Sequence, residues 1–109
     1  MAIFENKILI QDPTQAGDTG VFDLYGMCGT LILECKGSGY KFHVEGQADV
    51  NDINNWTEIT GIQAEGFNTV DDVTADGIYT YGVVGLTRAR VYIETPGTNL
   101  IVYAAVIKD

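Results

Sequence analysis

The chain has 109 residues, of which 46% are hydrophobic and 19% are charged. This length suffices for one domain with a modest core, and the composition excludes a disordered tail. Six Lys and Arg against 15 Asp and Glu leave a net charge of -9. The chain therefore lacks the basic surface that nucleic acid requires, and an anionic membrane would repel it. We expect neither partner, and we expect a single domain over residues 1–109, in which residues 1–20 form an N-terminal arm or a first strand followed by a loop.

Short strand-like runs separated by turn residues follow one another along the chain, and no segment repeats apolar residues at helical spacing. In the clearest run Tyr40, Phe42 and Val44 alternate with polar residues, which is typical of a strand with one face in a core and one in water. The sequence therefore predicts an all-β fold, an antiparallel, jelly-roll-like β-sandwich of about eight strands. The strand-like runs cover residues 4–10, 21–24, 31–36, 40–45, 56–62, 67–73, 78–84, 88–94 and 100–107, and residues 11–20 form a turn-rich loop.

The last run, LIVYAAVI at 100–107, is apolar on both of its faces. An antiparallel strand with one face in water should instead alternate between apolar and polar residues. No helix is expected that could cover the second face, so another part of the chain or another subunit must do it. We expect a homo-oligomer built on sheet faces. Its interface is predicted at Leu100, Val102, Ala104 and Val106.

Residues suited to catalysis are scarce. His43 is the single histidine and is expected to be an exposed strand residue, because no Ser-His-Asp or Cys-His set can be assembled around it. Cys28 and Cys35 form no Cys-x-x-Cys motif, and Cys35 lies in an apolar run where it is expected to be buried. No signal peptide is recognisable. We expect a protein that is not an enzyme, binds no cofactor and is made in a reducing cytoplasm.

The stretch EGQADVNDINNWTEIT, residues 45–60, concentrates Asp and Asn side chains. An EF-hand loop beginning at Asp49 is excluded, because its fifth position would be Ile53. A looser Ca²⁺ site at Asp49, Asn51 and Asp52 stays open. Asp and Asn also bond their own backbone in turns, however, and this explains the composition without a metal. We expect a strand connection that holds no metal.

Trp56 is the only Trp of the chain and follows this acidic loop directly. It is a candidate for stacking on a sugar ring beside Asn54 and Asn55, because carbohydrate-binding sandwiches combine an aromatic platform with polar neighbours. The competing interpretation is a lid on the core, since Trp is the largest apolar side chain that the fold has to bury. The two interpretations differ in what the mutation Trp56→Ala would do to the fold.

The run 88–94 predicts a basic and aromatic strip on a strand face. Its alternate positions are apolar and point inward, whereas Arg88, Arg90 and Tyr92 point outward. Arg and Tyr are enriched at protein interfaces. The strip is therefore a candidate contact surface, and the alternative is that the two arginines pair with neighbouring carboxylates.

Several short motifs follow one another in a fixed order: VEG at 44–46, NWTEI at 55–59, DGIY at 76–79, VVGL at 83–86 and ARVYI at 89–93. This order, together with the N-terminal MAIFENKILI, resembles small β-sandwich structural proteins of tailed bacteriophages. The likeness extends over most of the chain. The acidic loop departs from the family pattern because it lacks the usual Asp-Gly turn.

The resemblance implies a non-enzymatic virion structural protein, either a capsid decoration protein or a fibre-base or tail-associated module, that acts as a homotrimer. Its partners would be further copies of itself and the major capsid or tail proteins. It would be synthesised in the cytoplasm of the bacterial host and reside in the virion. The alternative function is a carbohydrate-binding β-sandwich module that uses Trp56 and the Asn/Asp loop.

Overall fold

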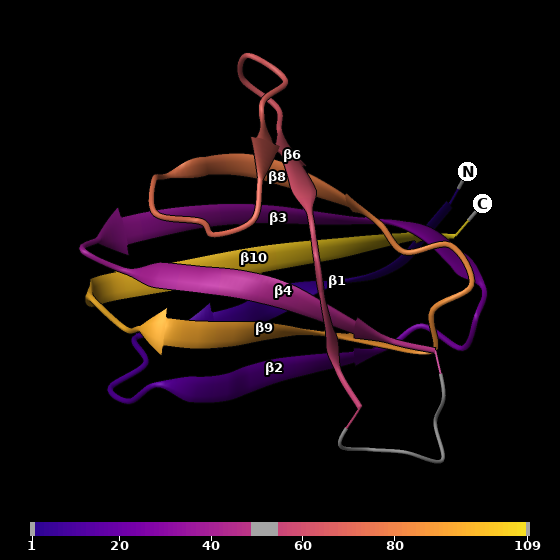
Figure 1. The fold of residues 1–109 in the computed structure, drawn as a ribbon, viewed down its shortest axis with the longest axis horizontal. Coiled ribbons are helices and arrows are strands. Elements are labelled where there is room, and N and C mark those ends of the chain that lie inside the picture. The colour runs from indigo at the N-terminus through magenta and orange to yellow at the C-terminus, as the bar shows by residue number, and fades with distance from the viewer. Residues whose placement is uncertain (1, 49–54, 109) are drawn as a thin grey trace.

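The computed structural model describes residues 2–48 and 55–108, and every regular element in these ranges is a β-strand. Two antiparallel sheets stack face to face, which confirms the predicted β-sandwich (Figure 1). One sheet has the strand order β1-β10-β3-β8-β6-β7 and the other β2-β9-β4-β5. The strands are β1 (Ala2–Gln11), β2 (Gly17–Asp23), β3 (Cys28–Ser38), β4 (Lys41–Gln47), β5 (Thr57–Ile59), β6 (Gly61–Gln63), β7 (Thr69–Val70), β8 (Gly77–Gly82), β9 (Arg88–Thr95) and β10 (Thr98–Lys108).

Sheets of six and four strands do not confirm the finer expectation of a jelly roll with about eight strands. No helix long and apolar enough to cross a membrane occurs in the described part of the chain. Residues 1–20 include β1, a loop and the beginning of β2, which starts at Gly17 inside the segment predicted as loop. β1 pairs with β10, so the two ends of the chain lie side by side (Figure 1).

The core lies between the sheets and is formed by the apolar positions of the alternating strands. The inward residues of β4 and β9 are fully buried, as their alternation predicted, and Cys35 is buried as well. Cys28 and Cys35 are both free cysteines, and burial raises the pKa of the Cys35 thiol. The largest fully buried side chains are Tyr79, Tyr81, Phe22, Phe42, Leu24, Leu31, Leu33, Ile93 and Leu100, with Val44, Val73 and Val83.

The segment predicted as one strand over residues 56–62 is divided between the two sheets, so this prediction was wrong. Its first half, β5, pairs with β4, and its second half, β6, pairs with β8 in the other sheet. Figure 1 shows this segment crossing from one sheet to the other. At the crossing Gly61 lies against the Tyr81 ring, where an added Cβ would come within 2.5 Å of Tyr81 Cε2. A glycine is needed here because any side chain would collide with a buried ring.

A polar contact that is only partly buried links the turn after β3 to the start of β8. Tyr40 Oη donates a hydrogen bond of 2.8 Å to Asp76 Oδ1, and the amide of Gly37 donates a bond of 3.0 Å to the same oxygen. Asp76 thereby ties the connection between β3 and β4, which lie in different sheets, to the start of β8.

Candidate functional site

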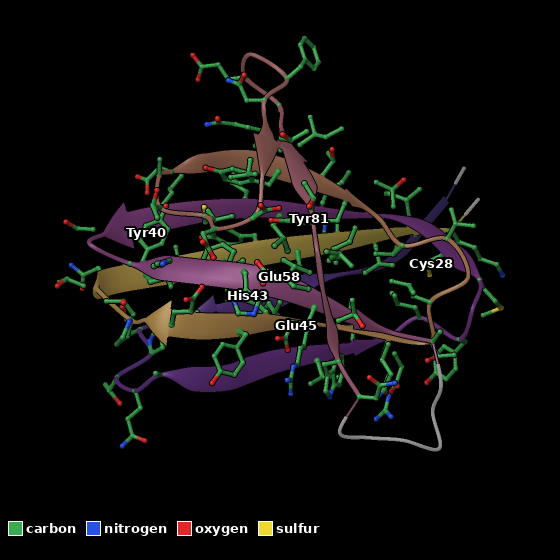
Figure 2. All side chains as sticks on the ribbon, in the orientation of Figure 1. Cys28, Tyr40, His43, Glu45, Glu58 and Tyr81 are labelled. Carbon is green, nitrogen blue, oxygen red and sulfur yellow. The ribbon has the colours of Figure 1, made fainter. Side chains whose placement is uncertain are left out.

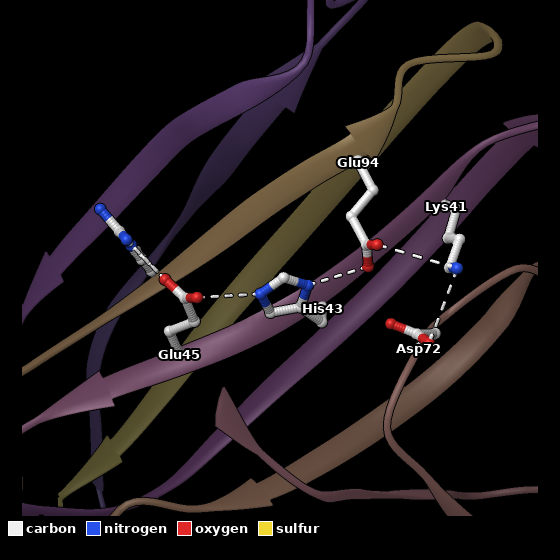
Figure 3. Close-up of polar contacts among 6 residues, drawn as sticks. Lys41, His43, Glu45, Asp72 and Glu94 are labelled. Carbon is white, nitrogen blue, oxygen red and sulfur yellow. Dashed lines mark hydrogen bonds and ion pairs between the residues drawn. The ribbon is translucent and has the colours of Figure 1, made fainter. Parts of the chain in front are cut away.

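A network of charged side chains covers the outer face of the four-stranded sheet. Its residues lie on β4, on β9 and beside the bridge between Phe42 and Val73, which joins the segment around Asp72 to β4. The alternation that buries the apolar residues of β4 and β9 turns the intervening residues outward. Figure 3 shows the resulting chain of contacts across the strands.

His43 lies at the centre of this network, held between two carboxylates. Its Nδ1 is 2.9 Å from Glu94 Oε2, and its Nε2 is 2.9 Å from Glu45 Oε2. The ring stacks on that of Tyr92, its cross-strand neighbour, with 5.2 Å between the ring centroids. Only 12% of the His43 side chain is exposed, so the expected exposed histidine is in fact largely covered by its partners.

The carboxylates control the charge of His43. Burial lowers the pKa of His43, but the hydrogen bonds to Glu45 and Glu94 and the nearby charge of Glu58 outweigh this effect, and the pKa is raised above its usual value. Protonated imidazole donates from both nitrogens. In this arrangement neither ring nitrogen is left to accept a proton from a substrate.

Glu45 continues the network from His43 to Arg90. Its Oε1 accepts a hydrogen bond of 2.6 Å from Nε of Arg90 and forms an ion pair with Nη2, also at 2.6 Å. Burial raises the pKa of Glu45, but the bonds to His43 and Arg90 outweigh it, and the pKa is lowered. The Arg90 guanidinium lies 4.3 Å from the centroid of the Trp56 ring and 5.6 Å from that of Tyr92. The strongest contacts of Arg90 are thus made within the chain.

Lys41 and Asp72 form the other end of the network. Lys41 Nζ lies 3.7 Å from Glu94 Oε1 and 3.9 Å from Asp72 Oδ2 (Figure 3). A hydrogen bond from Asp72 to Glu94 raises the pKa of Asp72, and the bonds from His43 and Asp72 lower the pKa of Glu94. Two carboxyl groups in contact favour sharing one proton, because both cannot ionise at low cost.

The predicted strip of Arg88, Arg90 and Tyr92 does face outward on β9, and Arg90 and Tyr92 belong to the charged network. The alternative interpretation, pairing with a carboxylate, therefore holds for Arg90. Arg88 lies 5.8 Å from the centroid of the Trp56 ring. The role of the strip as a contact surface stays a prediction.

Trp56 is partly exposed and is not part of the buried core, so the expected core lid is not observed. One neighbour of its ring is the guanidinium of Arg90. Asn55 is exposed, and its carbonyl oxygen accepts a hydrogen bond of 3.5 Å from Gln47 Nε2. The other candidates of this loop, Asn54 for a glycan and Asp49, Asn51 and Asp52 for a metal, lie outside the described residues.

The structure reverses the predicted roles of the two faces of β10: the face predicted to contact another subunit belongs to the core. The side chains expected at a subunit interface are buried within the single chain and are exposed by no more than 2%. They form part of the core because β10 lies between β1 and β3, where its inner face packs against the other sheet. A second subunit could reach only the opposite face of the strand. The residues concerned are Leu100, Val102, Ala104 and Val106.

The outer face of the six-stranded sheet is predominantly apolar. Tyr103 lies opposite Ile8 on β1, and Ala105 lies opposite Ile32 on β3. Glu34 is opposite Tyr103 on one side and Ile78 on the other. Large apolar side chains remain exposed across the whole sheet: Ile8 by 51%, Ile62 by 44%, Ile78 by 42% and Tyr103 by 37%. We call these four residues, with Ile32 and Ala105, the apolar outer face.

Sequence reasoning found the outward direction of His43 and Arg90 but missed their partners. The alternation that turns His43 and Arg90 outward also turns Glu45 and Glu94 outward. The sequence therefore contained a signal for these two partners. The approach of Glu58 and Asp72 depends on β5 and on the bridge to β4. No local pattern in the sequence encodes those pairings.

The fold is similar to that of two solved structures. One is that of the "SPBc2 prophage-derived protein YomS", with a TM-score of 0.80, 15% identity, and coverage of 94% of this chain and 90% of that one. The other is that of the "PBSX exported protein XepA", with a TM-score of 0.80, 14% identity, and coverage of 94% of this chain and 37% of that one. No protein-family model and no curated protein matches the chain. At these identities the likeness establishes a shared β-sandwich fold.

Proposed function

We propose that the protein is a non-enzymatic structural component of a phage particle and that it acts as a homo-oligomer. Within this role we favour a capsid decoration or fibre-base module, a trimeric assembly, and contact with major capsid or tail proteins. The protein would be made in the cytoplasm of the bacterial host and would reside in the virion. The observation that carries the proposal is the apolar outer face of the six-stranded sheet.

An apolar sheet face of this kind is unusual on a protein that works alone. The four exposed residues Ile8, Ile62, Ile78 and Tyr103 lie on four different strands of one sheet, so they form a surface and are not isolated. Scattered apolar side chains need no explanation, whereas contiguous patches mark association sites. The strand register places one acidic residue, Glu34, between these side chains. A second copy could therefore bury this face without bringing two like charges together.

The structural neighbours support the phage context of the proposal. One neighbour is a prophage-derived protein, and the other is an exported protein of PBSX. The motif order described above resembles structural proteins of tailed phages. Many copies that each bind weakly can coat a particle stably through multivalency. A small acidic sandwich with one apolar face suits this mode of action.

The test is the solution mass of the protein measured by light scattering after gel filtration. The wild type is expected to be oligomeric, and the double variant Ile78→Gln/Tyr103→Gln is expected to be monomeric because both changes lie on the apolar outer face. The control is Val21→Gln/Val84→Gln, which replaces side chains exposed by 41% and 79% away from that face. A monomeric wild type, or equal loss of mass in both variants, would overturn the proposal.

The alternative, a carbohydrate-binding module, rests on Trp56. Arg90 lies over its ring at 4.3 Å, so a sugar would compete with the guanidinium for that aromatic face. The rings of Tyr40 and Tyr79 are buried, so neither is available to stack on a sugar. Glycan-array binding that disappears in a folded Trp56→Ala variant would favour this function over the structural one.

A further inference from the structure

We infer that His43, Glu58 and Asp72 form a binding site for a divalent transition metal, with Zn²⁺ as the best match. Each of the three side chains offers one ligand atom, and these atoms all lie within 4.8 Å of one another. They come from β4, from β5 and from the segment bridged to β4, so the fold brings together residues far apart in the sequence. Glu58 and His43 lie near each other in Figure 2.

The choice of metal follows from the donor atoms. An imidazole nitrogen with two carboxylate oxygens is a donor set of zinc and its transition-metal neighbours, whereas Ca²⁺ and Mg²⁺ prefer oxygen ligands alone. Zn–N and Zn–O bonds of about 2.0–2.2 Å would place pairs of ligand atoms about 3.4 Å apart. The three atoms therefore need to approach one another modestly, and Glu58 is exposed and free to move.

The charges around the site provide a second, independent argument. Four carboxylates surround His43, from Glu45, Glu58, Asp72 and Glu94, and two cations, Lys41 and Arg90, accompany them. Metal ligands must be deprotonated, and with the imidazole neutral and all four carboxylates ionised these groups would carry two excess negative charges, which a bound divalent cation would balance. Glu45 and Glu58 even lie directly opposite each other on paired strands. Like charges in this position destabilise a sheet. A divalent cation would offset both the excess negative charge and the repulsion between Glu45 and Glu58.

The existing contacts of His43 indicate how it would bind. Nε2 faces Glu45, which Arg90 holds by a hydrogen bond and an ion pair. Nδ1 faces Glu94, whose carboxylate shares Lys41 with Asp72. Nδ1 is thus the nitrogen on the Asp72 side and becomes the ligand. Glu45 stays bonded to Nε2 and orients the ring, as carboxylate partners of metal-bound histidines commonly do.

Metal binding would change two contacts seen in the structure. The proton on Nδ1 leaves, because a histidine ligand must present a lone pair. Glu94 then loses its hydrogen bond and is near enough to supply an oxygen as the fourth ligand, or gives way to water. Lys41, with 44% of its side chain exposed, moves away from Asp72 into solvent. Neither change requires movement of a strand.

The experiment is a calorimetric titration of ZnCl₂ into the full chain after chelator treatment and dialysis. We expect one saturable site per chain, no competition from Ca²⁺, and loss of binding in His43→Gln. Asp72→Asn and Glu58→Gln should each weaken binding at least about tenfold, since even outer-shell changes at metal sites cost that much. The matched controls are Asp71→Asn and Glu65→Gln, which make the same charge changes at exposed positions outside the site. They should bind as the wild type does.

Three results would overturn the inference: no saturable binding, unchanged affinity in His43→Gln, or equal losses in Asp71→Asn and Asp72→Asn. A second measurement on the wild type does not depend on any variant folding. The chain has a single histidine, so its imidazole NMR signals are unambiguous and must shift with one equivalent of Zn²⁺. Unmoved signals in the presence of bound zinc would place the metal elsewhere. Oligomerisation through the opposite sheet is unaffected by either outcome.

Discussion

The two sheets present equally apolar inner faces but very different outer faces. On the four-stranded sheet, charged residues bond to one another across β4 and β9, and Arg90 and His43 each contact aromatic rings. On the six-stranded sheet, Ile8, Ile78 and Tyr103 meet solvent directly. The inner faces explain why the chain folds. The outer faces differ because the side chains of one are paired within the chain, whereas the other leaves large apolar side chains exposed to solvent.

This difference assigns separate roles to the two faces. Ionic pairs across a partly exposed sheet contribute specific geometry and modest stability, and they create a place for a cation. An exposed apolar surface contributes nothing until a partner buries it, and then it supplies the main favourable free energy of association. The predictions that follow test the division, beginning with the largest expected effect.

The assignment of the β10 faces is tested by comparing Leu100→Ala with Ile101→Ala. Leu100 is fully buried, so its truncation should lower the free energy of unfolding by about 2–5 kcal/mol, through lost burial and the cavity left behind. Ile101 is partly exposed and should lose less than about 1.5 kcal/mol. Urea denaturation measures both. Equal losses would mean that the two apolar faces of β10 are buried to the same extent.

The next effect concerns the strongest ionic contact on the charged face. Arg90→Met should lower the free energy of unfolding by about 1.5–3 kcal/mol, because it leaves the largely covered carboxylate of Glu45 without its main donor. The control Lys41→Met removes a more exposed cation at 3.7–3.9 Å from its partners and should cost no more than about 0.5 kcal/mol. If the two variants had the same stability, the network would not stabilise the sheet.

Trp56→Ala should cost about 1 kcal/mol, the contribution of a partly exposed cation–π contact with Arg90. The protein should remain folded, since Trp56 is not part of the core. Circular dichroism and thermal melting measure this result. Complete unfolding would instead show that Trp56 supports the core, as one interpretation of the sequence proposed.

The smallest effect is expected from pH, measured in the presence of chelator. The raised pKa of His43 means that its contribution is fully present below its ordinary value of 6.5 and is lost as the pH rises through the folded-state value. The lowered pKa of Glu45 has the opposite sense: its contribution is present above 4.5 and is lost as the pH falls through the folded-state value. The contribution of this pair should therefore be greatest between about pH 4.5 and 6.5. His43→Gln should abolish the decline on the alkaline side, and a decline that persists would have to come from other groups.

Local pattern was enough to establish the all-β class and most strands. Strict alternation at Tyr40, Phe42 and Val44 leaves one side for the core, because successive side chains of a strand point in opposite directions. The absence of helical periodicity was equally informative. The segment 56–62 was not, because its division depends on Gly61 meeting the ring of Tyr81 in the other strand.

By itself, the sequence determined the fold class, the direction of most side chains and the burial of Cys35. Only the tertiary structure decided which apolar face of β10 belongs to the core, since both faces read alike and the choice depends on which one meets the second sheet. The same holds for the site around His43. Its partners Glu58 and Asp72 arrive through strand pairing over long sequence separations, and such pairing is fixed by the packing of the whole sandwich and by no local propensity.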